Sequence, residues 1–270
     1  MNFKKIWHWM IPLAILFSII LSCTASDIVS WQEEVVLHDG SKIMVDRSQS
    51  YGGRRELGQS PPIKEQTISF TMPNTNEYIS WKNEYGEDIK RANFTPLALH
   101  ISNGVPYIIL KPALCLSYNK WGRPNPPYVI FKFHSKVWQR ISLEELPIEL
   151  DSINLVIITK SNEKVLLDES PINSVLMKEL NRGLKQPELN GILRKPVYTG
   201  YCPVMIHDGK GNWISDDSFK RQPDIDACLN YCKREGYDAK HCPCNQIFGE
   251  KQHGICADGG ACLPKYSWKR

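Results

Sequence analysis

The residues of this chain with the clearest potential for chemistry are its nine cysteines. Seven of them fall between Cys202 and Cys262, in a stretch that is rich in Gly, Asp and Lys and poor in apolar runs. A segment that buries little apolar surface usually depends on cross-links or on a bound metal for its stability. The chemistry to expect here is therefore disulfide formation, metal ligation or thiol–disulfide exchange.

Cross-linking is the interpretation that the cysteine count favours. Apart from Cys23, which lies in the N-terminal targeting segment, the remaining cysteines are even in number: Cys115, Cys202, Cys228, Cys232, Cys242, Cys244, Cys256 and Cys262. An even number in an exported chain indicates a disulfide framework. Because Cys115 lies outside the cysteine-rich stretch, complete pairing requires at least one bridge between the two parts of the chain.

One arrangement of these bridges has a physical motive. The segment from Asp224 to Glu235 is expected to be helical, so that Cys228 and Cys232 lie on one helix face. Cys242 and Cys244 also share a face if their segment is extended. We therefore predict that two bridges join the helical pair to the extended pair, and a direct bond within the helical pair would contradict this prediction.

Two other uses of the same region stay open. Ligands suitable for zinc lie close together in the sequence: His241, Cys242, Cys244, His253 and Cys256. The two cysteines around Pro243 could instead exchange disulfides if the neighbouring Lys240 favoured a thiolate. Neither spacing matches the usual zinc or redox motif, so no cofactor is expected, with zinc at this tail as the alternative.

The N-terminus has the pattern of an export signal. Lys4 and Lys5 precede a mostly apolar stretch from Ile6 to Ile20, and Ser22 and Cys23 follow it closely. The apolar stretch has 15 residues, whereas a membrane-spanning helix needs about 20. We therefore expect residues 1–22 to be a signal peptide that is removed.

The residues Ile20-Leu21-Ser22-Cys23 resemble the lipobox of bacterial lipoproteins, although Leu21 stands where a smaller or β-branched residue is commoner. The resemblance implies that Cys23 becomes the first mature residue and carries a diacylglyceryl lipid, with acyl chains such as palmitate. Several acyl chains give stable anchoring. In such lipoproteins, an Asp directly after the lipidated cysteine favours retention in the inner membrane. This chain has Thr24 there, so the resemblance implies that the protein is anchored in the outer membrane of a bacterial cell envelope and faces the periplasm.

The next part of the chain, up to about Lys160, has the pattern of successive β-strands. Turn pairs between alternating apolar segments predict hairpins, which are centred on Asp39-Gly40, Asn103-Gly104 and Ser135-Lys136. A fourth hairpin is predicted from residues 153–159 and 164–167. Short strands at this spacing are typical of an antiparallel sandwich, barrel or partial propeller.

The predicted fold is therefore mainly β, with one covering helix and a small disulfide-stapled tail. The helix is expected to begin at Ser170, its N-cap, and to end at Gly183. We expect a lipidated N-terminus and β domain over residues 23–186, a linker over residues 187–196, and a cysteine-rich tail over residues 197–270.

Two polar stretches of the β region, residues 51–58 and 117–128, have the composition of binding surfaces. The first combines Tyr, Gly and Arg, and the second is expected to be a long, Pro-rich, aromatic loop. The candidate contact residues are Tyr118, Trp121, Arg123, Arg54 and Arg55. The alternative is a structural connection in which Trp121 plugs the end of the sheet.

No catalytic constellation is evident in the sequence. The GxSxG, HExxH and GxxxxGK[ST] motifs are absent. The adjacent pair His207-Asp208 is better explained by a turn, since neighbours on a strand point to opposite faces. An enzyme would have to assemble its site in the fold, and a cleft joining two or more of the following residues would favour one: His38, His100, His134, Glu84 and Asp88.

The charge balance excludes one class of partner. The chain has 33 Lys and Arg against 29 Asp and Glu, and loss of Lys4 and Lys5 would leave 31 against 29, a net charge of +2. Nucleic-acid binding usually needs a clear basic excess, so no nucleic acid is expected. A composition that is 42% hydrophobic and 23% charged is ordinary for a globular protein.

Three stretches resemble an uncharacterised family of proteobacterial exported proteins and lipoproteins: Trp31–Gly40, Tyr51–Gln59 and Leu114–Tyr128. The resemblance covers about residues 30–160 and not the cysteine-rich tail. The resemblance implies location in the cell envelope, and it assigns no activity and no catalytic residue to this chain. The favoured function is an envelope lipoprotein that binds a protein partner or a glycan without catalysis, and the alternatives are a hydrolase-like envelope enzyme and a purely structural role.

Overall fold

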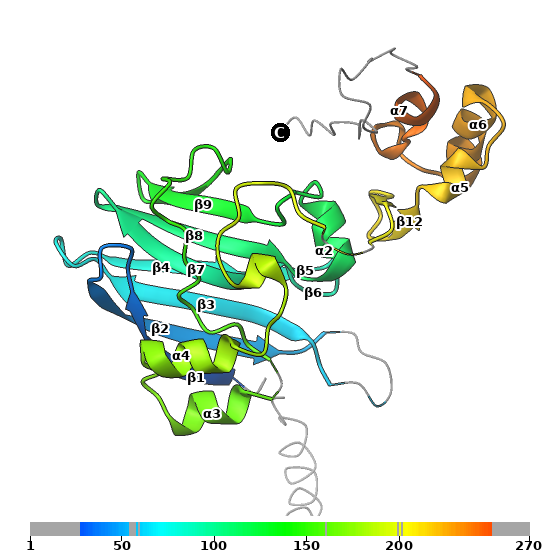
Figure 1. The fold of residues 1–270 in the computed structure, drawn as a ribbon. Coiled ribbons are helices and arrows are strands. Elements are labelled where there is room, and N and C mark those ends of the chain that lie inside the picture. The colour runs from blue at the N-terminus through cyan, green and yellow to red at the C-terminus, as the bar shows by residue number, and fades with distance from the viewer. Residues whose placement is uncertain are drawn as a thin grey trace, which may run out of the picture.

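The computed structural model describes residues 28–53, 58, 60–159, 161–198, 200 and 202–249 of the 270-residue chain. Its body consists of two four-stranded antiparallel sheets, and its C-terminal part holds small helices and bridged cysteines (Figure 1). The mainly-β prediction is therefore confirmed. Five sites predicted from the sequence lie outside the described residues: Cys23, Arg54, Arg55, Cys256 and Cys262.

The first sheet is a simple meander in which each strand pairs with the next along the chain. Its strands are β1 (Ile28–Val36), β2 (Lys42–Tyr51), β3 (Ile63–Thr71) and β4 (Tyr78–Asn83). The hairpin predicted at Asp39-Gly40 joins β1 to β2. Asp39 accepts a hydrogen bond from the Ser41 N–H at 2.9 Å, and Gly40 has φ 82°, so both residues suit the turn.

The second sheet repeats this arrangement in the order β10-β9-β8-β7. Its strands are β7 (Phe94–Ser102), β8 (Val105–Pro112), β9 (Val129–His134) and β10 (Val137–Ile141). The hairpins predicted at Asn103-Gly104 and Ser135-Lys136 are confirmed. A short ribbon of β5 (Tyr85–Gly86) and β6 (Arg91–Ala92) leads from the first sheet to the second.

The two sheets pack face to face, so the body is a sandwich and not a barrel or propeller (Figure 1). Val45 and Phe70 from the first sheet share one buried cluster with Leu99 and Ile108 from the second. Along β2, buried side chains alternate with more exposed ones, as expected for a sheet with one buried face. Strands β7 and β8 are buried on both faces, because a second apolar cluster covers their other side. Burial of this apolar area is the main favourable contribution to the fold.

The fourth predicted hairpin is wrong. Residues 151–159 are extended but form no strand, and residues 163–168 form a helix, α3 (Glu163–Asp168). The Asn154 side chain takes the place of strand pairing, since its amide donates to the carbonyls of Val36 at 3.0 Å and of Leu99 at 2.7 Å. This segment therefore joins the edges of both sheets, and its partners are distant in sequence.

The predicted covering helix is present as α4 (Ser174–Asn181), but its start differs from the prediction. Asn173, not Ser170, is the N-cap, and its side chain accepts from the N–H groups of Val175 and Leu176, each at 3.0 Å. Ile172 cannot join the helix because its backbone pairs with β1. Helices α3 and α4 cover the side of β1 (Figure 1).

The C-terminal part begins after a 3-10 turn, η2 (Pro187–Leu189). It contains β11 (Met205–His207), β12 (Trp213–Ser215), α5 (Asp217–Lys220), α6 (Ile225–Glu235), η3 (Ala239–His241) and α7 (Cys244–Phe248). Residues 187–196, expected to be a linker, pack against the second sheet, where Leu189 and Ile192 are buried. None of the helices within the described residues is long and apolar enough to cross a membrane.

Candidate functional site

Several segments that are distant in the sequence enclose a cleft of about 990 Å³ at one end of the sandwich. Segments that are far apart in the sequence line it: the end of β2, the start of β3, β6, the start of α2 (Leu114–Lys120) and the approach to α3. These segments contribute polar groups of Tyr51, Arg91 and Glu163 to walls that are otherwise mainly apolar. The cleft therefore combines an apolar interior with a few polar contacts.

A glycine pair allows the chain to turn beside this cleft. Gly53 follows the end of β2 with φ 102°, a conformation that favours glycine. A Cβ atom at this position would lie 3.1 Å from the carbonyl oxygen of Lys90 and 3.0 Å from the ring of Tyr85. The Gly-rich composition of this stretch, noted in the sequence, therefore has a structural cause.

A row of buried polar side chains crosses the first sheet towards the cleft. Gln49, Gln66 and Asn83 are direct neighbours on β2, β3 and β4, on the inner face where apolar residues are expected. Asn83 donates to Gln66 at 2.8 Å, and Gln66 donates to Gln49 at 3.3 Å. Gln49 in turn donates to the hydroxyl of Tyr51. The row connects the middle of the sandwich with the cleft.

Tyr51 is held as a neutral hydrogen-bond donor at the end of this row. Burial raises the pKa of its phenol, and a hydrogen bond to the Glu163 carboxylate raises that pKa further. Glu163 lies in the first turn of α3, where the helix dipole favours a negative charge. The pair therefore fixes the orientation of two polar groups on one side of the cleft.

The opposite charge in the cleft is supplied by β6 and the residue before it. Lys90 lies 3.6 Å from the carboxylate of Glu87. Arg91 is partly buried, burial lowers the pKa of its guanidinium, and its Nε has no hydrogen-bond partner within the described residues. Buried polar groups are normally paired, so this unpaired Nε distinguishes Arg91 from the other described residues of the lining.

An exposed apolar residue with an unusual backbone conformation also contributes to the cleft. Leu114 has φ 63°, in the left-handed region, and is 68% exposed. For a residue with a Cβ this conformation costs about 1–2 kcal/mol, and such strain is concentrated at functional sites.

The predicted aromatic loop is wrong in its first part, because residues 114–120 form the helix α2. Trp121 packs against the ring of Phe94, with ring centroids 4.5 Å apart, and donates to the side chain of Asn93 at 3.2 Å. Arg140 covers its other surface, with its guanidinium carbon 5.4 Å from the ring centroid. Trp121 therefore packs against the core cluster and stays partly exposed, which agrees with the structural alternative.

Two other predicted contact residues are also used within the molecule. The guanidinium of Arg123 lies 5.0 Å from the ring centroid of Tyr118 and donates to the carbonyls of Cys202 at 3.0 Å and Pro203 at 3.2 Å. The disulfide between Cys115 and Cys202 links the same two segments. These residues clamp the tail to α2, and the predicted bridge between the body and the tail is confirmed.

The tail contains the two predicted bridges. Cys228 is bonded to Cys244, and Cys232 is bonded to Cys242, with Cα atoms 5.7 Å and 6.0 Å apart. Asp224 caps α6 by accepting from the Ala227 N–H at 2.8 Å, so the one-turn spacing of the helical cysteines is maintained. The predicted pairing is therefore confirmed. The segment of the second pair is not extended as predicted, because Cys244 is the first residue of α7.

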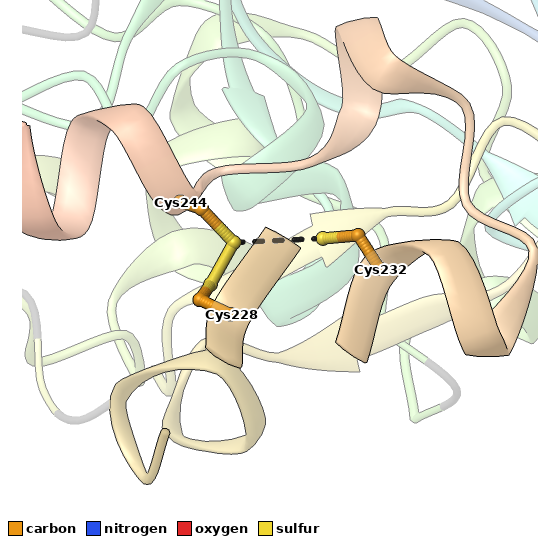
Figure 2. A group of neighbouring side chains, drawn as sticks. All are labelled: Cys228, Cys232 and Cys244. Atoms are coloured by element: carbon orange, nitrogen blue, oxygen red, sulfur yellow. Dashed lines mark hydrogen bonds between the residues drawn. A yellow bond between two sulfur atoms is a disulfide. The ribbon is translucent and has the colours of Figure 1, made fainter. Parts of the chain in front are cut away.

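Three sulfurs of this group lie close enough to hold a metal if they were reduced. The sulfur atoms of Cys228, Cys232 and Cys244 all lie within 4.8 Å of one another. Figure 2 shows the three side chains pointing toward one another. Two of them are bonded to each other and the third is bonded to Cys242, so the thiolates that zinc needs are not present in this form. Zinc binding by a reduced tail stays a prediction.

The residues proposed for an enzyme are mostly kept apart. His38 and His100 approach with ring centroids 6.4 Å apart, but the His100 Nε2 hydrogen-bonds the carbonyl of Ser152 at 2.9 Å and burial lowers the pKa of the ring. Asp88 pairs with Lys120 at 2.7 Å. In the described part of the chain, no hydrogen bond joins any two of the five candidates.

Most residues that line the cleft were missed in the sequence. The exceptions are Tyr51, in its polar stretch, and Cys115, which was predicted to form a disulfide. One signal was present: Gln49 and Gln66 occupy positions of β2 and β3 that should be apolar by alternation. Polar residues at inward positions indicate a buried network. No sequence pattern indicated that Arg91 and Glu163 would line a cleft. Each directly follows turn residues, where charged side chains are common.

No protein-family model, curated protein or solved structure matches this chain. The resemblance to proteobacterial exported proteins therefore stays a prediction, and the function is argued from the geometry of the site.

Proposed function

We propose that this protein is a lipid-anchored binding protein of the bacterial cell envelope, without catalytic activity, whose cleft holds a small ligand. The observation that carries the proposal is the cleft itself. Its volume of about 990 Å³ lies at the upper end of the range of roughly 300–1,000 Å³ usual for ligand sites. Its apolar walls with a few oriented polar groups also have the usual composition of such sites.

Binding is favoured over catalysis by the chemistry of the lining. Tyr51 stays protonated because its pKa is raised, and Cys115 is bonded to Cys202. The described lining contains no histidine, so it lacks the commonest general base. Tyr51, Arg91 and Glu163 can hold and orient a ligand, and none of them forms a nucleophile–base pair.

The cleft is tested with a fluorescent apolar probe, anilinonaphthalene sulfonate, and with Ile63→Trp, which places a large side chain in the cleft wall. We expect saturable binding of the probe by the wild-type chain and loss of that binding in the variant. Val137→Trp is the control, because Val137 is an exposed apolar residue of β10 outside the cleft. Equal binding by wild type and Ile63→Trp would contradict the proposed site.

The anchor is tested separately by metabolic labelling with a fatty acid. We expect label on the wild-type chain and none on Cys23→Ser, with the intact mass fitting cleavage before Cys23 and a lipid adduct. A wild-type chain that carries no label and retains residues 1–22 would contradict the proposed lipid anchor in the cell envelope.

A further inference from the structure

We propose that the ligand of the cleft is a single-chain amphiphile with an anionic head group, such as a long-chain carboxylate, drawn from the membrane that anchors the protein. This inference rests on the proposed binding function and names the class of its ligand. It is carried by three observations: an unpaired cation, apolar walls and a short distance along the chain to the anchor.

The head group is assigned by the charges of the lining. The charged residues of the described lining are Lys90, Arg91 and Glu163, which leave one net positive charge. Glu163 accepts a hydrogen bond from Tyr51, and Lys90 lies 3.6 Å from the carboxylate of Glu87. Arg91 forms no ion pair within the described residues, and its buried Nε has no hydrogen-bond partner there. A guanidinium presents a planar fork that matches an acidic group, and such charge-assisted hydrogen bonds are strong.

The chain of the ligand is assigned by the apolar walls. Ile63, Ile89, Leu116 and Ile158 line the cleft from four different segments. Leu114 adds an apolar side chain that is 68% exposed. An apolar chain bound in the cleft would cover this side chain together with the four others. A small hydrophilic anion would leave these side chains in contact with water.

The source of the ligand is assigned by the length of the chain before β1. Val29 lines the cleft and lies six residues after Cys23. Six residues span at most about 22 Å when fully extended. If Cys23 carries the lipid, the cleft wall at Val29 is held within that distance of the membrane surface. A membrane amphiphile would then have a short path to the cleft.

The test is calorimetric titration of the full mature chain carrying Cys23→Ser, so that no attached acyl chain competes. The probes are dodecanoate, dodecanol with the same chain and no charge, and butyrate with the same head group and a short chain. We expect dodecanoate to bind about ten-fold tighter than either of the others. Equal affinity for dodecanol and dodecanoate would overturn the anionic head group, and equal affinity for butyrate would overturn the apolar chain.

The role of Arg91 is tested with two variants and a matched control. Arg91→Gln should weaken dodecanoate binding by about ten-fold or more, because it removes a hydrogen bond to a charged group, and should leave dodecanol binding unchanged. Arg91→Lys keeps the charge and should retain part of the affinity. Arg182→Gln, at the exposed C-cap of α4, should change neither affinity. Unchanged dodecanoate affinity in folded Arg91→Gln would overturn the assignment.

The two proposals fail in different ways. If anilinonaphthalene sulfonate binds and Ile63→Trp abolishes that binding, but no dodecyl probe displaces it, the binding function stands and the amphiphile is wrong. If neither the sulfonate nor the dodecyl probes bind, the proposed function itself is wrong.

Discussion

At the scale of single residues, a buried ion pair joins β1 and β2 inside the body of the protein. Arg47 and Glu33 approach to 2.6 Å, and each side chain is 2% exposed. Glu33 also accepts from the indole of Trp31 at 2.7 Å and from the Val156 N–H at 3.0 Å, and Arg47 donates to the Val156 carbonyl at 2.8 Å. Because both charges are hydrogen-bonded, the pair can tolerate burial.

Removal of one partner should leave the other charge buried and uncompensated. We expect Arg47→Met to lower the free energy of unfolding by about 3–5 kcal/mol, measured by urea denaturation, and Glu33→Met with Arg47→Met to lose less. Lys42→Met is the matched control, because the Lys42–Glu34 pair is partly exposed and should be worth about 1 kcal/mol or less. Similar losses in Arg47→Met and Lys42→Met would contradict the role of the buried pair.

Asp208 is a second residue whose environment makes a measurable prediction. Burial alone would raise the pKa of its carboxyl, but hydrogen bonds from the side chain and backbone of Asn212 and the backbone of Lys210 lower that pKa to about 2. The folded pKa is depressed, so the stabilisation is present above the ordinary value of 3.8 and is lost as the pH falls towards about 2.

The measurement is a carbon NMR titration of the Asp208 carboxyl in the folded protein. We expect a midpoint near 2, and Asn212→Ala should raise it towards 3.8. Asp226, on the exposed surface of α6, provides a comparison in the same tail. A midpoint of 3.8 for Asp208 in the wild-type protein would contradict the turn geometry.

At the scale of elements, the start of α4 shows how sheet pairing overrides a local helix signal. Ser170 and Pro171 form a good helix start in isolation, but Ile172 exchanges two backbone hydrogen bonds with β1, each 2.8 Å long. The backbone of Ile172 cannot make sheet bonds and helical bonds at the same time. The helix therefore begins after the sheet contact, with Asn173 as its cap.

The position of this cap can be tested by stability measurements. Asn173→Ala should lower the free energy of unfolding by about 0.5–2 kcal/mol, because two N–H groups of the first turn lose their acceptor. Ser174→Ala, one residue into the helix, should have an effect of about 0.5 kcal/mol or less. A larger loss in Ser174→Ala than in Asn173→Ala would show that the helix starts elsewhere.

At the scale of the whole molecule, α2 connects the cleft with the tail. Its first residues, Leu114 to Leu116, line the cleft, and Cys115 is bonded to Cys202 of the tail. At its other end, Asn119 donates to the Pro203 carbonyl at 3.0 Å. The tail lies beyond this helix at the end of the sandwich (Figure 1). One short helix therefore contacts both the cleft and the tail.

The three bridges should differ in their resistance to a mild reductant under native conditions. Cys228, Cys232 and Cys244 are buried, whereas Cys115 and Cys202 are both partly exposed. We expect the Cys115–Cys202 bridge to be reduced first, since access of a thiol governs the exchange rate. Stepwise alkylation followed by peptide mass mapping measures the order. Earlier alkylation of Cys228 and Cys244 would contradict it.

The sequence determined the features of this protein that depend on neighbouring residues. Asp39-Gly40 and Asn103-Gly104 predicted their hairpins because a tight turn is encoded by the conformations of a few residues. The tail bridges were predictable for the same reason, since helical spacing puts Cys228 and Cys232 on one face and their partners are 16 and 10 residues away.

Only the tertiary structure decided which polar and aromatic residues face a cavity and which are buried. Trp121 and Arg123 have the composition of a binding surface, but both contact residues from distant segments. Phe94 packs against Trp121 at the edge of the core, and the carbonyl of Cys202 accepts from Arg123. Arg91 and Glu163 meet at the cleft for the same reason. The environment of a side chain is set by contacts across the whole chain, and residue type and local spacing do not contain that information.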